Sequence, residues 1–265
     1  MRLLFGLMFF VFAAFAHAQI VGKDIPSRPG VTVRIAYAKA ENPVASAVLF
    51  QGGPGKIGVF PNGSIKADWL FLSGGAKRFT DNNITVAIID APTDRQDLNG
   101  KFRSSQEHAE DAAAVIAFLR SESKLPVWAI GTSNGSLSAA NAAERLESRG
   151  PDGIVLTASA TNAAEYPDLV HIVTDAKLLE ISLPTLWVHH KGDECKHTPY
   201  DAIPPLVASM KKSSRVELIT VEGGNNSKLQ TFYRPCNSGY HQFQGIESDV
   251  IKSIADWIKK VEAGR

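Results

Sequence analysis

The sequence predicts an α/β protein with a mostly parallel central sheet and helices on both faces. Short apolar runs typical of buried strands alternate along the chain with segments whose apolar residues recur at helical spacing. Strands covered on both faces form continuous apolar runs, and this pattern favours a parallel sheet. The chain has 265 residues, 44% of them hydrophobic, which is enough for one packed domain of this class.

Seven segments are expected to form strands. In the first and the last segment, successive residues fall into two alternating sets that would face opposite sides of the sheet, as in half-buried strands. The segments between them are short apolar runs bounded by turn residues. In chain order the predicted strands are residues 31–36, 45–50, 84–89, 127–130, 154–156, 185–188 and 216–221.

Three segments are expected to form helices. Each places apolar residues on one face, and Gly150-Pro151 is a typical stop signal after the second. The predicted helices are residues 106–120, 134–149 and 246–261.

The N-terminus predicts a secretory signal peptide over residues 1–18. Arg2 is followed by an apolar run, and Ala16-His17-Ala18 is a typical cleavage site. The run is shorter than the roughly 20 residues of a membrane span, although an uncleaved anchor is the alternative. Cleavage leaves one predicted domain, residues 19–265, which we expect to be secreted or periplasmic with no stable membrane anchor.

Composition argues against several other functions. The 28 basic and 27 acidic residues give a net charge of +1, without the basic excess that binds nucleic acid.

A cluster of residue types that bind metals follows the strand at 185–188: His189, His190, Asp193, Glu194 and His197. Neighbouring strand residues point to opposite faces, however, and an H-E-x-x-H motif is absent. We therefore expect no metal, no other cofactor and no nucleic-acid partner.

Residues 131–135 read Gly-Thr-Ser-Asn-Gly, a G-x-S-x-G motif between a predicted strand and a predicted helix. A nucleophilic serine in this motif occupies a sharp turn, which exposes its hydroxyl and leaves no room for side chains on the flanking glycines. Ser133 is therefore the predicted nucleophile. The alternative is a glycine-rich turn with an ordinary hydroxyl.

The acid and the base of a triad on such a turn follow the serine in the order acid, then histidine. Asp193, in the loop after the strand at 185–188, is the predicted acid, and Glu194 is the alternative. His241 lies in the loop before the last helix, and of the seven histidines it alone has the order and setting of the base. Because the base must be unprotonated, we expect the rate to rise with pH through the neutral range.

The oxyanion formed by the attacked carbonyl requires two N–H donors. We expect one from Asn134, just after the nucleophile, and the other from Gly53 in the glycine-rich loop at residues 51–55. Residues 53–58 also match G-x-G-x-x-G, but Pro61-Asn62-Gly63 breaks any helix there, so a dinucleotide site is not expected.

The two cysteines of an exported chain are expected to pair, giving a Cys195–Cys236 disulfide. This bond joins the loop of the predicted acid to the loop of the predicted base. We expect it to position the Asp193–His241 hydrogen bond; a staple unrelated to catalysis is the alternative.

These motifs, in this order, resemble those of the α/β-hydrolase superfamily over most of the chain from about Val31 onward. The resemblance implies an eight-stranded, mostly parallel sheet and an esterase, lipase, lactonase, thioesterase or serine peptidase. Residues 51–55 are similar to the His-Gly-Gly-Pro-Gly of the proline-iminopeptidase branch, with Gln51 in place of the histidine. That branch carries a helical cap where only a short stretch separates Leu156 from Thr185 here, so little or no lid is expected.

The predicted function is that of a secreted serine hydrolase that cleaves a small or accessible carboxylic ester through an acyl-enzyme. A serine peptidase or amidase of the same fold is the first alternative. An alternative of another class is a catalytically silent α/β-hydrolase-like binding protein, in which Ser133 would resist acylation.

Overall fold

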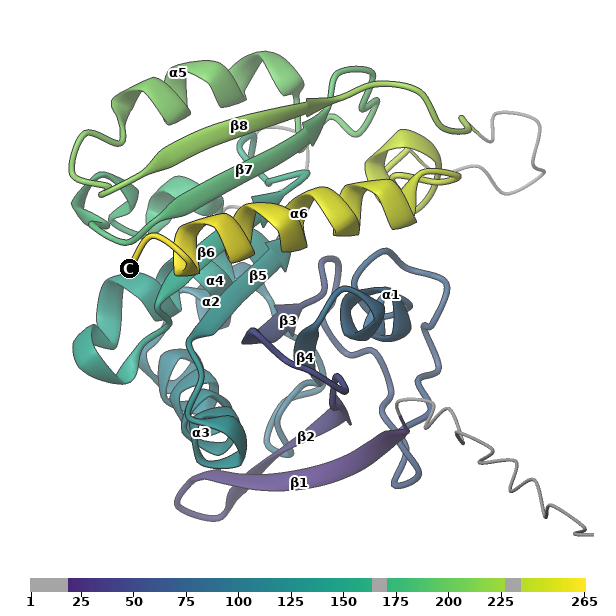
Figure 1. Cartoon of the computed structure of the whole chain (residues 1–265), viewed down its shortest axis with the longest axis vertical. Helices are drawn as coiled ribbons and strands as arrows, with labels where there is room; N and C mark the ends of the chain where they lie inside the picture. The colour runs from purple at the N-terminus through teal and green to yellow at the C-terminus, as the bar shows by residue number, and fades with distance from the viewer. Residues whose placement is uncertain (1–18, 164–170, 227–234) are drawn as a thin grey trace, which may run out of the picture.

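An eight-stranded sheet forms the centre of the molecule (Figure 1). The structure is a computed structural model that describes residues 19–163, 171–226 and 235–265, so the predicted signal peptide lies outside the described residues. The strand order is β1-β2-β4-β3-β5-β6-β7-β8. The predicted fold class is confirmed.

Six of the strands are parallel, and the two N-terminal strands are antiparallel additions at one edge. β1 pairs with β2, and β2 with β4, in antiparallel register, whereas every pair from β4 to β8 is parallel. The strands are β1 (Ile20–Arg28), β2 (Val31–Ala38), β3 (Ala45–Phe50), β4 (Ile84–Ile89), β5 (Val127–Thr132), β6 (Gly153–Thr157), β7 (Thr185–His190) and β8 (Val216–Val221). The carboxyl ends of the parallel strands therefore share one edge, where ligands of such sheets bind.

Helices cover both faces of the sheet and bury two separate apolar cores. α3, α4 and α5 pack on one face and α1 and α6 on the other. The α-helices are α1 (Ala76–Asp81), α2 (Gly100–Arg103), α3 (Gln106–Ser123), α4 (Gly135–Arg145), α5 (Ile203–Ser209) and α6 (Glu247–Glu262). The short 3₁₀ helices are η1 (Glu147–Arg149), η3 (Val173–Asp175), η4 (Leu178–Glu180), η5 (Tyr200–Ala202) and η6 (Gly239–Gln242).

Two local features differ from the prediction. β1 was not predicted, because Gly22 and Pro26 interrupt its pattern; proline is tolerated there since β1 is an edge strand. The helix predicted over residues 134–149 ends as an α-helix at Arg145. Glu147 has a φ of 48°, which no α-helix accommodates, and the chain continues as η1.

Between β6 and β7, residues 158–163 and 171–184 contain only η3 and η4, in keeping with the expected absence of a large lid. Across the described ranges, none of the helices combines the length and the apolar character needed to cross a bilayer.

His108 on α3 is buried in the core beneath the sheet edge. Its ring packs between Phe50 of β3 and Phe102 of α2, with centroid separations of 5.8 and 5.2 Å. Neither ring nitrogen has a hydrogen-bond partner among the described residues. Burial, with a contribution from the charges of Arg103 and Arg28, lowers the pKa of His108 to about 3.

Because the folded chain excludes a proton that unfolded His108 binds below about pH 6.5, the free energy of unfolding should fall as pH decreases from 6.5 toward 3. From pH 7 to pH 5 the contribution of this one group is about 2 kcal/mol. Urea denaturation at both pH values measures it: wild type should lose more stability than His108→Leu by about this amount. Equal losses in the two proteins would contradict the prediction.

Candidate active site

Ser133 occupies the sharp turn between β5 and α4. Its φ of 53° lies in the left-handed region, a strained conformation for a residue with a side chain. The turn is held by the N–H of Ser133, which donates to the carbonyl of Thr157 at 3.0 Å. A Cβ added to Gly131 would lie 2.1 Å from the carbonyl oxygen of Gly135, so the expected lack of room is present.

Asp193 and His241, from loops after β7 and β8, meet at the carboxyl edge of the sheet. Nδ1 of His241 lies 2.9 Å from Oδ2 of Asp193, and both side chains are fully buried. The acceptor for His241 is the carboxylate of Asp193, whereas the alternative acid Glu194 is exposed. Nε2 of His241 is buried and has no hydrogen-bond partner among the described residues. With Nδ1–H donating to the carboxylate, Nε2 is the nitrogen that accepts a proton.

The carboxylate of Asp193 stays ionised despite its burial. Burial acts to raise its pKa, but the neighbouring His241 and His189 rings and hydrogen bonds from His241 and the Cys195 N–H outweigh burial and hold the pKa well below its usual range. An ionised partner stabilises the imidazolium that forms when His241 takes up a proton.

Thr198, which the sequence did not single out, completes the environment of the acid. Its hydroxyl donates to Oδ2 of Asp193 at 2.8 Å and lies 3.1 Å from Nδ1 of His241. Nε2 of His189 donates to the backbone carbonyl of Thr198 at 2.8 Å. The only sequence signal for this role is that Thr198 shares the acid's loop.

The two predicted oxyanion donors, Gly53 and Asn134, line the same pocket as Ser133. Among the described residues, no acceptor within hydrogen-bonding distance engages the N–H of Gly53 or of Asn134. The carbonyl of Gly52 accepts from the N–H of Gly55 at 3.2 Å, which directs the other side of the Gly52–Gly53 peptide away from that turn. These N–H groups are available for an anionic oxygen.

A pocket of about 230 Å³ is lined by the predicted site residues other than Asp193. Ser133, His241, Gly53 and Asn134 all contribute to its lining, so loops after β3, β5 and β8 converge there. The remaining lining residues are Gln51, Gly52, Pro54, Leu70, Cys195, His197, Cys236, Asn237 and Gln242.

Two glutamine side chains of the pocket lining form hydrogen bonds with the backbone of residues 71–73. Oε1 of Gln51 accepts the N–H groups of Leu72 and Ser73 at 3.2 and 3.1 Å. Oε1 of Gln242 accepts the N–H of Phe71 at 2.9 Å. Gln51 thus provides an amide oxygen that accepts hydrogen bonds from residues 72–73, at the position where the proline-iminopeptidase motif has a histidine.

A disulfide joins Cys195 to Cys236, two residues of the chain separated by 41 positions. Both cysteines line the pocket, and the N–H of Cys195 donates to Oδ1 of Asp193 at 2.9 Å. The bond thus connects the acid's loop to the segment that leads into His241.

The histidine-rich cluster after β7 is organised by backbone contacts. His189, His190 and His197 each place a ring nitrogen within 3.0 Å of a backbone carbonyl, those of Thr198, Gly223 and Asn162 respectively. In the part of the chain that the structure describes, no three His, Cys, Asp or Glu side chains are grouped to hold a metal ion.

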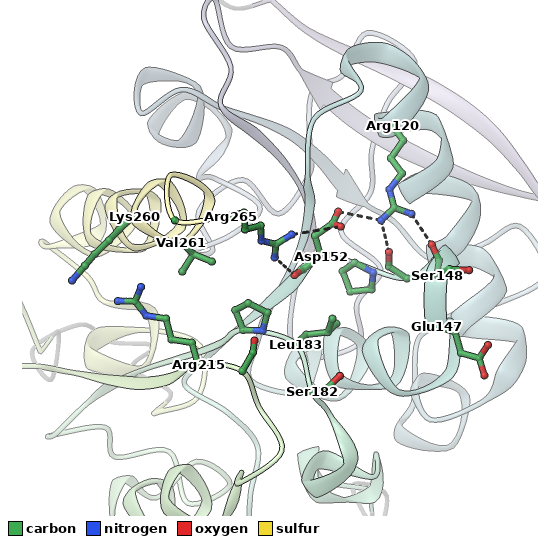
Figure 2. A pocket seen from close by; sticks show the side chains of 15 residues that line it. Arg120, Glu147, Ser148, Asp152, Ser182, Leu183, Arg215, Lys260, Val261 and Arg265 are labelled. Carbon is green, nitrogen blue, oxygen red and sulfur yellow. Dashed lines mark hydrogen bonds and ion pairs between the residues drawn. The ribbon is translucent and has the colours of Figure 1, made fainter.

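A larger pocket of about 560 Å³ lies at the opposite edge of the sheet, before β6, β7 and β8 (Figure 2). Asp152 at its centre accepts a hydrogen bond from Arg120 at 3.1 Å and forms an ion pair with Arg265. None of the predicted site residues lines this pocket.

The sheet and the serine turn after β5 define the molecule as an α/β hydrolase. The family model described as "Serine aminopeptidase, S33" matches residues 69–213, more than half of the chain. The protein therefore belongs to this family, and the predicted superfamily is confirmed. The matched segment includes Ser133 and Asp193 and ends before His241. No curated protein sequence matches the chain.

Solved structures share the fold at low sequence identity. A predicted CIB-like hydrolase from Thermoplasma acidophilum is 16% identical with a TM-score of 0.58, covering 92% of this chain and 99% of its own. A serine hydrolase without a lid from Xanthomonas campestris is 13% identical with a TM-score of 0.58, covering 91% and 94%. An esterase from Pyrococcus furiosus is 12% identical with a TM-score of 0.61, covering 92% and 93%.

Substituting Gly52 should disable the site without unfolding the chain. A Cβ there would lie 2.6 Å from Cβ of Ser133 and 2.8 Å from the carbonyl oxygen of Thr132. We expect Gly52→Ala to lower kcat for a p-nitrophenyl ester about 100-fold or more, because the loop carrying the Gly53 N–H is pushed from the nucleophile.

Gly30→Ala is the control, since no atom lies within 4 Å of an added Cβ in the β1–β2 turn. Its backbone strain lowers stability while kcat stays unchanged. If Gly52→Ala retains more than about a tenth of the wild-type kcat, the loop is not closely packed on Ser133 in solution.

Removing the disulfide should affect both stability and turnover. We expect Cys195→Ser/Cys236→Ser to lower the free energy of unfolding by about 2–4 kcal/mol. We also expect it to lower kcat well below the melting temperature, since the acid and base loops are no longer joined. Urea denaturation and initial rates measure the two effects. Lost stability with unchanged kcat would support a staple unrelated to catalysis.

Proposed function

We propose that this protein is an exported serine hydrolase that cleaves a small carboxylic ester. The observation that carries the proposal is the buried Asp193–His241 pair, whose Nε2 is without a partner among the described residues. His241 lines the same pocket as Ser133 on its strained turn. A base oriented by an acid beside a serine hydroxyl is the arrangement that activates a serine nucleophile.

In the first half of the reaction, Oγ of Ser133 attacks the ester carbonyl carbon while Nε2 of His241 takes the hydroxyl proton. The carbonyl oxygen becomes an oxyanion and accepts hydrogen bonds from the N–H groups of Gly53 and Asn134. The C–O bond to the alcohol then breaks, and the alcohol leaves with the proton from His241. Ser133 now carries the acyl group as an ester.

Water completes the reaction. His241 removes a proton from a water molecule, whose oxygen attacks the acyl carbon, and the second oxyanion occupies the same two donors. The bond to Oγ of Ser133 breaks as the serine recovers its proton from His241. The carboxylic acid leaves, and neither a metal nor an organic cofactor enters these steps.

Pocket chemistry favours an ester over the aminopeptidase substrate that the family description suggests. An aminopeptidase must compensate the free α-ammonium group of its substrate, and an anion near the nucleophile does so most strongly. No Asp or Glu is among the described residues that line the pocket. The volume of about 230 Å³ favours a short acyl chain. The named esterase among the structural neighbours supports the same choice.

Export is part of the proposal. The N-terminal segment has the order of a signal peptide, and the Cys195–Cys236 bond persists in oxidising compartments. We propose that the mature protein acts outside the cytosol on a small-molecule or accessible ester, without a nucleic-acid partner or a membrane anchor.

A fluorophosphonate probe tests the nucleophile directly. We expect the oxidised mature protein to be labelled at Ser133, located by peptide mapping, and Ser133→Ala to remain unlabelled. Panels of p-nitrophenyl esters and aminoacyl p-nitroanilides then define the substrate class. Short-chain esters should be cleaved fastest.

Faster cleavage of the anilides would establish the peptidase instead. A folded protein that is neither labelled nor active on either panel would be the binding protein, with Asp193 and His241 as structural residues.

A further inference from the structure

Arg103, the last residue of α2, is fully buried behind the loop that carries Gly53. Its Nη2 donates to the backbone carbonyls of Gln51 and Gly53 at 3.0 and 3.1 Å. Nη1 donates to Oγ of Ser138 on α4 at 2.8 Å, and Nε to the carbonyl of Leu98 at 2.9 Å. One guanidinium therefore joins the loop at residues 51–55 to α4, the helix that begins just after the nucleophile.

The two loop carbonyls that Arg103 binds lie on either side of the Gly52–Gly53 peptide. That peptide carries the N–H proposed to bind the oxyanion. Glycine has no side chain to restrict its backbone, so a loop with two successive glycines samples many conformations unless external contacts hold it. Fixing the peptide planes on either side of the Gly52–Gly53 peptide restricts the direction in which the Gly53 N–H points.

Arg103 is also unusual as a buried charge. No carboxylate within the described ranges hydrogen-bonds to it, and its acceptors are three carbonyls and one hydroxyl. Burial lowers its pKa to about 9, an effect that the charge of Asp97 opposes, so the group is cationic at neutral pH. A buried cation without a hydrogen-bonded anion destabilises a fold, whereas behind an oxyanion site it favours the negative charge that develops there.

We propose that Arg103 is a positioning residue of the oxyanion site, which holds the Gly53 N–H in place through the carbonyls of Gln51 and Gly53. The inference rests on the proposed hydrolase function. It predicts that replacing the guanidinium of Arg103, whose N–H donors lie in one plane, lowers the rate of acylation more than it weakens substrate binding.

Arg103→Met and Arg103→Lys test the proposal against Arg120→Met as a matched control. Arg120 also holds a loop, donating to the carbonyls of Ser148 and Gly150, but at the opposite edge of the sheet. Each variant is assayed for kcat and KM on a short p-nitrophenyl ester, for the rate of fluorophosphonate labelling and for thermal stability. Hydrogen exchange of the peptide that covers residues 51–55 reports on the loop independently of turnover.

We expect both Arg103 variants to lower kcat and the labelling rate by about 10- to 100-fold, with KM within about threefold of wild type. Exchange in residues 51–55 should be faster. Arg120→Met should lower thermal stability while keeping the wild-type kcat. If Arg103→Met does not fold, Arg103→Lys decides, because it retains the charge and much of the volume but not the planar fork.

Wild-type kcat in a folded Arg103 variant, or an equal loss of kcat in Arg120→Met, would overturn the proposal. Unchanged exchange of residues 51–55 in the Arg103 variants would overturn it as well. An unlabelled, inactive wild type is a different result: it rejects the hydrolase function itself, and with it the oxyanion role of Arg103.

Discussion

The fully buried carboxylate of Asp193 is the constraint on which the site depends. A buried charge destabilises a fold unless hydrogen bonds and a neighbouring positive or polarised group compensate it. The Cys195 N–H, the Thr198 hydroxyl and the His241 ring provide this compensation. Because these donors come from the acid's loop and from the segment after β8, satisfying one charge brings two distant parts of the chain together and selects the tautomer of His241.

Hydrogen bonds also connect the different parts of the pocket lining to one another. Gln51 extends from the end of β3 and Gln242 from η6, and their amide oxygens accept the N–H groups of residues 71–73. Leu70, just before these residues, is part of the pocket wall. The wall, the glycine-rich loop and the histidine segment are therefore linked by hydrogen bonds, and a shift in one displaces the others. On the proposed function, the size of the substrate pocket and the geometry of the oxyanion donors are therefore coupled.

Sequence patterns predicted the parts of this structure that local chemistry determines. Buried parallel strands are continuous apolar runs, so they were recognised, whereas β1 depends on pairing with β2 and contains Gly22 and Pro26. The triad candidates were found because the serine turn and its chain order have a local signature. Gln242 and Arg103 have none, since each acts by binding backbone groups remote in sequence, and Thr198 is indicated only by its place in the acid's loop. Such roles can be recognised only from the three-dimensional structure of the loops.

The order in which the site residues occur along the chain has a consequence for biosynthesis. The turn of Ser133 follows β5 and Asp193 follows β7, but His241 and the second cysteine come only after β8. On the proposed function, a growing chain that ends just after Asp193 carries the serine and the acid without His241, the group that would activate the serine. The proposed reactivity of Ser133 would therefore arise only when the segment after β8 has been made and has packed against the sheet.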